Sequence, residues 1–257
     1  MAGTIKPSEA RMRVPEFFEG RSPDANWTLR VLTEGGKTRK RALTFVGEDW
    51  EAFSRFGKVA SEVVVDENGR PLFDRPVYYE QPCVNVVAWG RDARTGEVKI
   101  AIITERRPHV NHPTLPDSTV PLAFAQIPMG FMERLVGKAG LSELEIAKSA
   151  GARETSEETG ATIIRGFSRP ACPWHNYSPS FMATWADLIF IEVDLEFIQE
   201  RKPDGDELIL HAEYLPVREL LARIREGQGK DGAIFRGCSS LSALMIFFSY
   251  YPEFWPR

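Results

Sequence analysis

The sequence predicts a protein of the α/β (α+β) class, in which buried strands are combined with helices. Two runs, Val84–Trp89 and Val98–Thr104, are almost continuous in β-branched and other apolar residues, as expected for strands buried on both faces. Within Arg153–Gly160, three glutamates recur at spacings of three and four residues, which places them on one face of a helix. The apolar run Leu241–Tyr251 is too short to span a bilayer and is typical of a buried helix.

Length and composition are those of an ordinary globular protein. The chain has 257 residues, of which 43% are hydrophobic and 26% are charged, so it suffices for one large domain or one domain with an appendage. The formal net charge is −4 and the isoelectric point is near 5.7, which gives no basic footprint for nucleic acid. An acidic protein that binds an anionic substrate must concentrate positive charge at its site, from arginines or a metal ion.

Cysteine usage and the distribution of apolar residues bear on localisation. The three cysteines, Cys83, Cys172 and Cys238, are odd in number and lack metal-binding spacing, which suits a reducing compartment. The segment Met1–Arg13 is polar and has no apolar core of a signal peptide. No apolar run approaches the roughly 20 residues that span a bilayer. We therefore expect a cytoplasmic protein with no nucleic-acid partner and no membrane partner.

The first part of the chain, residues 1–82, is predicted to be a small β-rich extension of a main domain that comprises residues 83–257. Its predicted strands, which are rich in β-branched and aromatic residues, are Trp27–Leu32, Arg41–Val46 and Val63–Val65. Aromatic residues at helical spacing predict a short helix at Glu48–Val59. This part is too short and too irregular to be an independent enzyme domain.

The main domain is predicted to alternate strands and helices. A helix is expected to begin after Ser142, with Glu145 as the partner of a capping box, and to end at Gly160 in a left-handed conformation. The remaining elements are recognised by apolar runs or helical periodicity, and they are the strands Trp185–Val193 and Leu208–Tyr214 and the helices Val217–Arg225 and Ser239–Tyr250.

The three glutamates of the central helix, Glu154, Glu157 and Glu158, repel one another. Like charges at these spacings oppose a helix by roughly 0.2–0.5 kcal/mol per pair, and a hard divalent cation such as Mg²⁺ would offset the repulsion because it prefers oxygen ligands. A solvated acidic helix face is the alternative interpretation, and it is the usual one for an arbitrary pair of glutamates.

The stretch around these glutamates resembles the Nudix box, a loop–helix–loop motif. The positions that match the motif are Glu145, Arg153, Glu154, Glu157, Glu158 and Gly160. Thr155 and Ala161 stand where the family usually has larger aliphatic residues. The leading glycine of the motif is replaced by Ala139 at its nominal place, so we interpret Gly130 as that glycine, followed by an insertion within Arg134–Leu144.

The resemblance covers about Cys83–Tyr250 and implies a Nudix fold, a mixed β-sheet sandwiched between helices. It also implies Mg²⁺- or Mn²⁺-dependent hydrolysis of a nucleoside diphosphate linked to another group, as in the ADP-ribose and nucleotide-sugar pyrophosphatases. The implied metal ligands are the carboxylates of Glu154, Glu157 and Glu158 and the main-chain carbonyl of Met129. In this family Arg153 would pair with a glutamate and orient it.

Further roles follow from the same resemblance. Arg106 and Arg107 are candidates for phosphate contacts, although two arginines in a surface loop are an equally good interpretation. Gly130 allows a close backbone approach to the substrate. Trp174 is a candidate for a nucleoside pocket, although a core residue is an equally good interpretation, and Ser178 is a candidate for substrate binding because Ser178-Pro179 matches a loop that precedes a strand in the family. Glu207 is our candidate for the glutamate that serves the family as general base or additional metal ligand, with Asp206 and Asp204 behind it, and a solvated acidic turn is the alternative interpretation. The predicted catalytic residues are therefore Glu157, Glu207 and Arg153.

Several alternatives stay open at this point. A dinucleoside polyphosphate or a coenzyme A derivative is the alternative substrate class. A different class of protein, a Nudix-fold regulator that binds a nucleotide metabolite without hydrolysing it, would be expected to lack the glutamates that this chain retains. The family also suggests that residues 1–82 mediate a homodimer.

Overall fold

A computed structural model of the chain describes residues 3–5, 27–33, 41–47, 57–65, 71–80, 82–107, 122–132, 140–173, 186–202 and 208–256, and for residues 3–80 the description covers the backbone. The chain divides into two compact units. The first comprises Met1–Gln81 with Asn176–Thr184, and the second comprises Pro82–His175 with Trp185–Arg257. The dimerising role of residues 1–82 stays a prediction.

The first unit contains a five-stranded antiparallel sheet in the order β1-β2-β3-β4-β5. Its strands are β1 (Gly3–Ile5), β2 (Trp27–Thr33), β3 (Arg41–Gly47), β4 (Gly57–Val65) and β5 (Pro71–Glu80). The three strands predicted from the sequence are confirmed, and β5 was not predicted. The predicted helix Glu48–Val59 is wrong at its end, because Gly57–Val59 belong to β4, where they pair with β5. Residues 48–56 lie outside the described residues.

The second unit contains a seven-stranded mixed sheet whose main path is β10-β11-β6-β7-β12. Its strands are β6 (Cys83–Arg91), β7 (Val98–Arg107), β8 (Leu122–Gln126), β9 (Met129–Phe131), β10 (Ile164–Ser168), β11 (Ala186–Val193) and β12 (Ile209–Pro216). Strands β6 and β11 run parallel, and the other pairs are antiparallel. The strands predicted from apolar runs are confirmed as β6, β7, β11 and β12, whereas β8, β9 and β10 were not predicted.

The two central strands separate along their length. β6 pairs with β7 only near the turn that joins them, through Trp89–Arg91 and Val98–Ile100. Farther from the turn, β6 pairs with β9 and β7 pairs with β8. The chain therefore passes from the edge of β7 to the edge of β6 between Gln126 and Met129, and this passage brings the backbone around Gly130 into the middle of the sheet.

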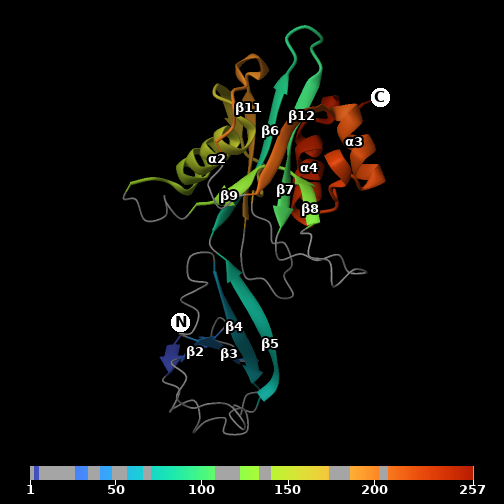
Figure 1. Cartoon of the computed structure of the whole chain (residues 1–257). Coiled ribbons are helices and arrows are strands. Elements are labelled where there is room, and N and C mark those ends of the chain that lie inside the picture. The colour runs from blue at the N-terminus through green and yellow to red at the C-terminus, as the bar shows by residue number, and fades with distance from the viewer. Residues whose placement is uncertain are drawn as a thin grey trace. The chain divides into compact units, whose positions relative to one another are not determined.

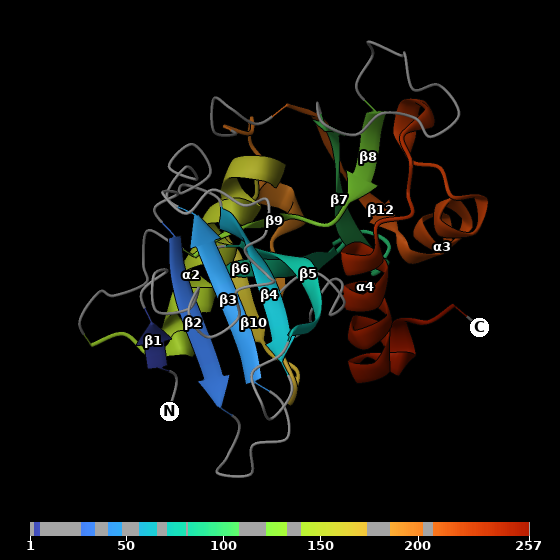
Figure 2. The same cartoon turned by 90° about the horizontal axis from the view of Figure 1, so that it is seen from below.

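Helices cover both faces of this sheet (Figures 1 and 2). The α-helices are α2 (Glu143–Thr159), α3 (Val217–Glu226) and α4 (Cys238–Tyr250), and single 3₁₀ turns lie at Leu195–Phe197, Lys230–Gly232 and Pro252–Phe254. Helix α2 lies on one face, which we call the α2 face, and α3 and α4 lie on the other, the α4 face. The predicted fold class, a mixed sheet between helices, is confirmed.

Two separate hydrophobic clusters fill these layers. On the α4 face the cluster contains buried aromatic rings, including Trp89, Phe190 and Phe247. On the α2 face it contains small and branched residues, including Ala147, Ala150 and Ile189. Among the described residues, no helix is long and apolar enough to cross a membrane.

Candidate metal and phosphate site

Helix α2 begins and ends where the sequence predicts. The Ser142 side chain accepts from the Glu145 N–H at 3.3 Å, and the Glu145 carboxylate accepts from the Ser142 N–H at 2.7 Å, which completes the capping box. The Ser142 hydroxyl also donates to the Glu145 carboxylate at 2.7 Å, and this hydrogen bond, followed by the one from the Ser142 N–H, lowers the pKa of Glu145. At the other end, Gly160 has φ 78°, and a Cβ atom there would lie 2.0 Å from the Gln199 carbonyl oxygen, so only glycine fits this end of the helix.

Small residues allow α2 to approach the sheet closely. Ala147 and Ala150 are fully buried, and a Cβ atom on Gly151 would lie 3.0 Å from the Ile189 side chain. Glu154 follows one helical turn farther along this packed side and Glu158 one turn after that, and their exposed fractions are 1% and 3%. The helix therefore buries two carboxylates against the sheet, which is the opposite of a solvated acidic face.

Strand β9 turns one of its edges towards these carboxylates. Its other edge pairs with β6, and the Val86 N–H donates to the Pro128 carbonyl at 2.9 Å. Because peptide groups alternate between the two edges of an antiparallel strand, the N–H and C=O groups of Met129 and Phe131 point away from β6. The carbonyl of Met129, predicted as a metal ligand, thus lies on the same edge of the strand as its N–H group.

That edge is in direct contact with α2. The Met129 N–H donates to Oε2 of Glu158 at 3.1 Å. A Cβ atom on Gly130 would lie 1.7 Å from Oε1 of Glu154, so a glycine is required for the Glu154 carboxylate to lie against the β9 backbone. This contact gives a physical reason for a glycine at position 130, whereas Ala139 lies outside the described residues.

Arg153 connects the carboxylates with β9. Its guanidinium donates to Glu157 at 2.8 Å and to the Phe131 carbonyl at 3.2 Å, and it also pairs with Glu154. A single arginine thus fixes two carboxylates and one strand edge. The prediction that Arg153 orients a glutamate agrees with these contacts, while its part in catalysis stays a prediction.

The donor set fits a hard divalent cation. Carboxylate oxygens from Glu154 and Glu158, with the Met129 carbonyl on the neighbouring strand edge, are the ligand types that Mg²⁺ and Mn²⁺ prefer. Across the described ranges, however, no three Asp, Glu, His or Cys side chains converge as a preformed metal site. Arg153 accounts for part of this arrangement, because it pairs with the carboxylates of Glu154 and Glu157. The metal-binding roles therefore stay predictions.

The predicted substrate residues are only partly within the described chain. Arg106 is exposed at the end of β7, and it pairs across the strands with Ala123, which packs against the cluster of the α4 face. Cross-strand partners share a face, so Arg106 projects away from α2. Arg107 belongs to β7, but its side chain, like Trp174, Ser178 and Glu207, lies outside the described residues.

A buried polar pair on the α2 face was not predicted from the sequence. The Gln126 side-chain amide donates to Oε2 of Glu105 at 2.6 Å, and both residues are buried. A signal was present in the sequence: the run that starts at Val98 continues into Glu105, so strand alternation places this acid on the same face as Ala101 and Ile103.

Two further contacts anchor the surroundings of α2. The buried Asp187 carboxylate pairs with Arg169 at 2.8 Å, and burial raises the pKa of Asp187 despite that pairing. The Tyr214 hydroxyl of β12 and the Thr159 hydroxyl at the end of α2 are 2.9 Å apart. Burial raises the pKa of Tyr214 to about 12, so this phenol is neutral throughout the physiological range.

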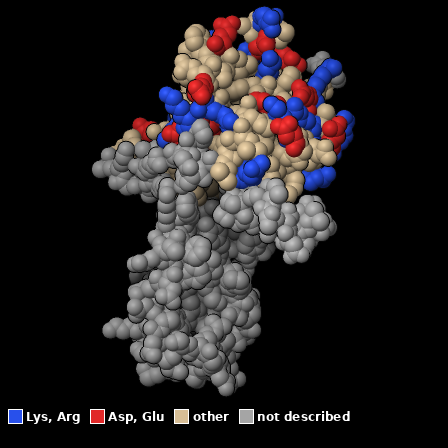
Figure 3. All heavy atoms as spheres, viewed as in Figure 1, with Lys and Arg blue, Asp and Glu red and all other residues tan. Residues whose placement is uncertain are grey.

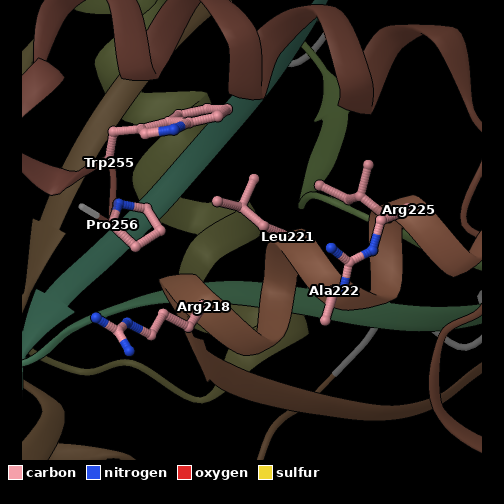
Figure 4. A pocket seen from close by; sticks show the side chains of 7 residues that line it. Arg218, Leu221, Ala222, Arg225, Trp255 and Pro256 are labelled. Carbon is pink, nitrogen blue, oxygen red and sulfur yellow. The ribbon is translucent and has the colours of Figure 1, made fainter.

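Elsewhere the described surface is less distinctive. In Figure 3, positive and negative side chains are interspersed over the visible face of the second unit. A groove of about 480 Å³ on α3 and the C-terminal segment is lined by Arg218, Leu221, Ala222, Ile224, Arg225, Trp255 and Pro256. Figure 4 shows the side chains that line it. Because α3 belongs to the α4 face, this groove is separate from the carboxylates of α2.

The similarity of this chain to known proteins is distant. No protein-family model and no curated protein matches the chain. Among solved structures, it is similar to an ADP compounds hydrolase, with 15% identity, coverage of 77% of this chain and 88% of that chain, and a TM-score of 0.44. It is also similar to the NUDIX domain of Shewanella oneidensis NrtR in complex with ADP ribose, with 12% identity, coverage of 66% and 88%, and a TM-score of 0.42.

A NUDIX hydrolase from Nitrosomonas europaea is similar as well, with 17% identity, coverage of 66% of this chain and 90% of that chain, and a TM-score of 0.38.

Proposed function

We propose that this chain is a Nudix-type hydrolase that cleaves the pyrophosphate bond of a nucleoside diphosphate linked to another moiety, with Mg²⁺ or Mn²⁺ as its cofactor. The observation that carries the proposal is the contact between α2 and β9. Two carboxylates that would be costly to bury without partners lie against the one strand edge that also presents the Met129 carbonyl. A structural acidic helix has no need of this arrangement.

In this proposal each residue of the contact has a definite task. Glu154, Glu157, Glu158 and the Met129 carbonyl would hold the ion, which when bound neutralises the phosphates and lowers the pKa of a bound water. Arg153 fixes the orientation of Glu154 and Glu157 through its guanidinium. The Met129 N–H holds the Glu158 carboxylate in place.

The remaining tasks belong to residues assigned from the Nudix resemblance. Deprotonation of the attacking water is assigned to Glu207, because a carboxylate within hydrogen-bond reach of a water can act as its base. Phosphate binding is assigned to Arg107 ahead of Arg106, because Arg106 projects away from α2. The nucleoside pocket is assigned to Trp174 and Ser178. The favoured substrates are ADP-ribose and nucleotide sugars, with dinucleoside polyphosphates and coenzyme A derivatives as alternatives.

A substrate panel tests the proposal. The purified chain is incubated with ADP-ribose, nucleotide sugars, a dinucleoside polyphosphate and coenzyme A, each with Mg²⁺, with Mn²⁺ or with EDTA, and the nucleotide products are separated by chromatography. We expect metal-dependent formation of a nucleoside monophosphate from ADP-ribose or a nucleotide sugar. Absence of turnover for every substrate under both metals would exclude hydrolysis of these compounds.

A second candidate function is nucleotide sensing without hydrolysis. One observation favours it: Arg153 pairs with both Glu154 and Glu157, so two of the three carboxylates already have a cationic partner. A sensor would bind ADP-ribose in calorimetry and raise the melting temperature with ligand concentration, without product formation. The homodimer proposed for residues 1–82 is tested separately by light scattering after removal of these residues.

A further inference from the structure

The segment Gln126–Met129, which we call the crossing segment, carries the chain from the edge of β7 to the edge of β6. It starts opposite Ile103 of β7 and ends opposite Asn85 of β6. Three peptide steps make this transfer, so the position of the Met129 carbonyl depends on how firmly the segment is held.

Each of the four residues is held by a different element of the fold. On the α2 face, Gln126 donates to Glu105 of β7 at 2.6 Å and Met129 donates to Glu158 of α2 at 3.1 Å. In the plane of the sheet, the Pro128 carbonyl accepts from a β6 N–H at 2.9 Å. From the α4 face, Ser240 accepts from the Ile127 N–H at 3.2 Å.

The contact from Ser240 is the least expected of the four. Ser240 is fully buried in α4, and it is separated from Ile127 by 113 positions in the chain. Its hydroxyl is the acceptor for a backbone donor that the strand ladder cannot satisfy, because Ile127 lies between β8 and β9. Helix α4 therefore contacts, from the α4 face, the backbone two residues before Met129.

We propose that Ser240 is a positioning residue, which acts from the opposite face of the sheet to hold the crossing segment and thereby the Met129 carbonyl beside Glu154 and Glu158. The inference rests on the proposed function, since it assigns a purpose to a precise placement of that carbonyl. The Glu105–Gln126 hydrogen bond holds the same segment from the α2 face. Ser240 does not contact the substrate or the ion.

The matched pair Ser240→Ala and Ser242→Ala tests the inference. Both residues lie in α4, but the Ser242 hydroxyl donates to the Ser239 carbonyl at 3.0 Å within the helix, so its removal leaves the crossing segment unchanged. Free Mn²⁺ is measured by electron paramagnetic resonance in the presence of each folded full-length variant, well below its melting temperature. We expect Ser240→Ala to weaken Mn²⁺ binding about tenfold, as for other residues that orient ligands, and Ser242→Ala to leave it unchanged.

A second readout does not depend on metal. Hydrogen–deuterium exchange of the peptide that contains residues 122–132 is compared among the wild type and the two variants. We expect faster exchange in Ser240→Ala than in Ser242→Ala, because the Ile127 N–H loses its acceptor. Equal exchange in the two variants would show that Ser240 does not hold the segment, whatever the metal result.

The outcomes separate the inference from the proposed function. If the wild type binds Mn²⁺ and Ser240→Ala binds it equally well, the positioning role is wrong and the metal site stands. If the wild type binds no Mn²⁺ and hydrolyses no substrate, the metal-dependent function is wrong, and the positioning role falls with it even where exchange is faster. A purely structural role for Ser240 predicts a lower melting temperature with unchanged Mn²⁺ affinity.

The reciprocal exchange Glu105→Gln/Gln126→Glu tests the hydrogen bond that holds the crossing segment from the α2 face. It moves the carboxylate across the pair while retaining an amide donor and a carboxylate acceptor. If the pair only holds the crossing segment, the double variant keeps the hydrogen–deuterium exchange rate and the Mn²⁺ affinity of the wild type. The variant Gln126→Ala should then exchange faster and bind Mn²⁺ more weakly. Loss of Mn²⁺ affinity in the double variant with normal exchange would instead assign the Glu105 carboxylate to the ion, and would overturn positioning as its role.

Discussion

The two faces of the main sheet are covered by different kinds of side chain. On the α4 face, Phe247 contacts a group of rings, with centroid distances of 5.2 Å to Phe190 and 4.9 Å to Tyr251. On the α2 face, alanines and a glycine bring the helix backbone close to the sheet, and the side chains that follow are carboxylates. Large rings maximise the apolar area removed from water, whereas small residues give up area so that a helix can approach closely.

This difference separates stability from chemistry in space. Burial of aromatic rings on the α4 face stabilises the fold chiefly by removing apolar area from water. The α2 face carries Glu154, Glu158, Asp187 and Glu105, all buried, and buried charges destabilise unless they are paired. Substitutions on the α4 face should therefore change the free energy of unfolding, and substitutions on the α2 face should change Mn²⁺ affinity and kcat. Ser240 is the position at which α4 contacts the crossing segment.

The largest effect is expected on stability, from Phe247→Ala. The side chain is fully buried and its removal leaves a cavity among rings that cannot collapse, so the free energy of unfolding should fall by about 3–5 kcal/mol. Urea denaturation measures the change. Met245→Ala on the same helix is the control, because Met245 is 63% exposed and should change stability by less than about 0.5 kcal/mol. A large loss of Mn²⁺ affinity in folded Phe247→Ala would break the separation of the faces.

The next effect is on activity, from Glu158→Gln. This change keeps the side-chain volume and an acceptor for the Met129 N–H, but it removes the charge that would hold the ion. Loss of several kcal/mol of stabilisation of the transition state corresponds to a fall in kcat of about 10²–10³. Stability should be unchanged or slightly higher, because like charges on α2 are relieved.

Glu219→Gln on α3 serves as the control for Glu158→Gln, since Glu219 is exposed and pairs only with Arg223 among the described residues. Its kcat should equal that of the wild type. Wild-type activity of Glu158→Gln at saturating Mg²⁺ would refute the proposed mechanism, and a large stability loss in that variant would show that Glu158 is structural.

A third effect is a dependence of stability on pH that originates on the α2 face. The pKa of Tyr214 is about 12 in the folded protein against 10.0 for the free side chain. Because the folded state holds the phenol proton more tightly, the stabilisation is complete below pH 10 and is lost between pH 10 and pH 12. Two pKa units correspond to about 3 kcal/mol.

The measurement for Tyr214 is the difference in unfolding free energy between the wild type and Tyr214→Phe as the pH rises. The wild type should lose stability relative to the variant across that window, and the difference should be constant at lower pH. A constant difference up to pH 12 would mean that the phenol ionises freely, so that the end of α2 is more accessible to water than the Thr159 contact indicates.

Sequence reasoning succeeded where local chemistry determines the structure. The capping box of α2, the left-handed Gly160 and the β-branched runs of β6 and β7 all follow from neighbouring residues. It missed β5, since Pro71 and Pro76 argue against a strand, although a strand at the edge of a sheet tolerates proline. It extended a helix over Gly57–Val59, where pairing with β5 overrides the helical spacing.

The site was predictable only in part for a related reason. The spacing of Glu154, Glu157 and Glu158 identifies one face of one helix, and the Nudix resemblance identifies Gly130. The contact from Ser240 depends on the separation of β6 from β7, which no local pattern shows. Glu105 was visible as an acid inside an apolar strand, but its partner Gln126 lies 21 positions later, and this pairing requires the register of β7 with β8.

The smallest effect is expected at the start of α2, from Ser142→Ala. The change removes the side-chain acceptor of the Glu145 N–H and the hydroxyl that Glu145 also binds at 2.7 Å, which should lower stability by about 1 kcal/mol and the melting temperature by about 2–4 °C. Ser149→Ala is the control, because Ser149 is exposed within the same helix and alanine is at least as good a helix former.

The cap and the carboxylates belong to one helix but to different turns, so Ser142→Ala changes the first turn of α2 alone. Glu154 and Glu158 are fixed by β9 and Arg153, so fraying of the first turn should leave them in place and leave Mn²⁺ affinity unchanged. A parallel loss of Mn²⁺ affinity in Ser142→Ala would mean that α2 moves as a rigid rod from its cap. In that case any change that destabilises α2 would also weaken Mn²⁺ binding, and only substitutions on the α4 face would leave the proposed reaction unaffected.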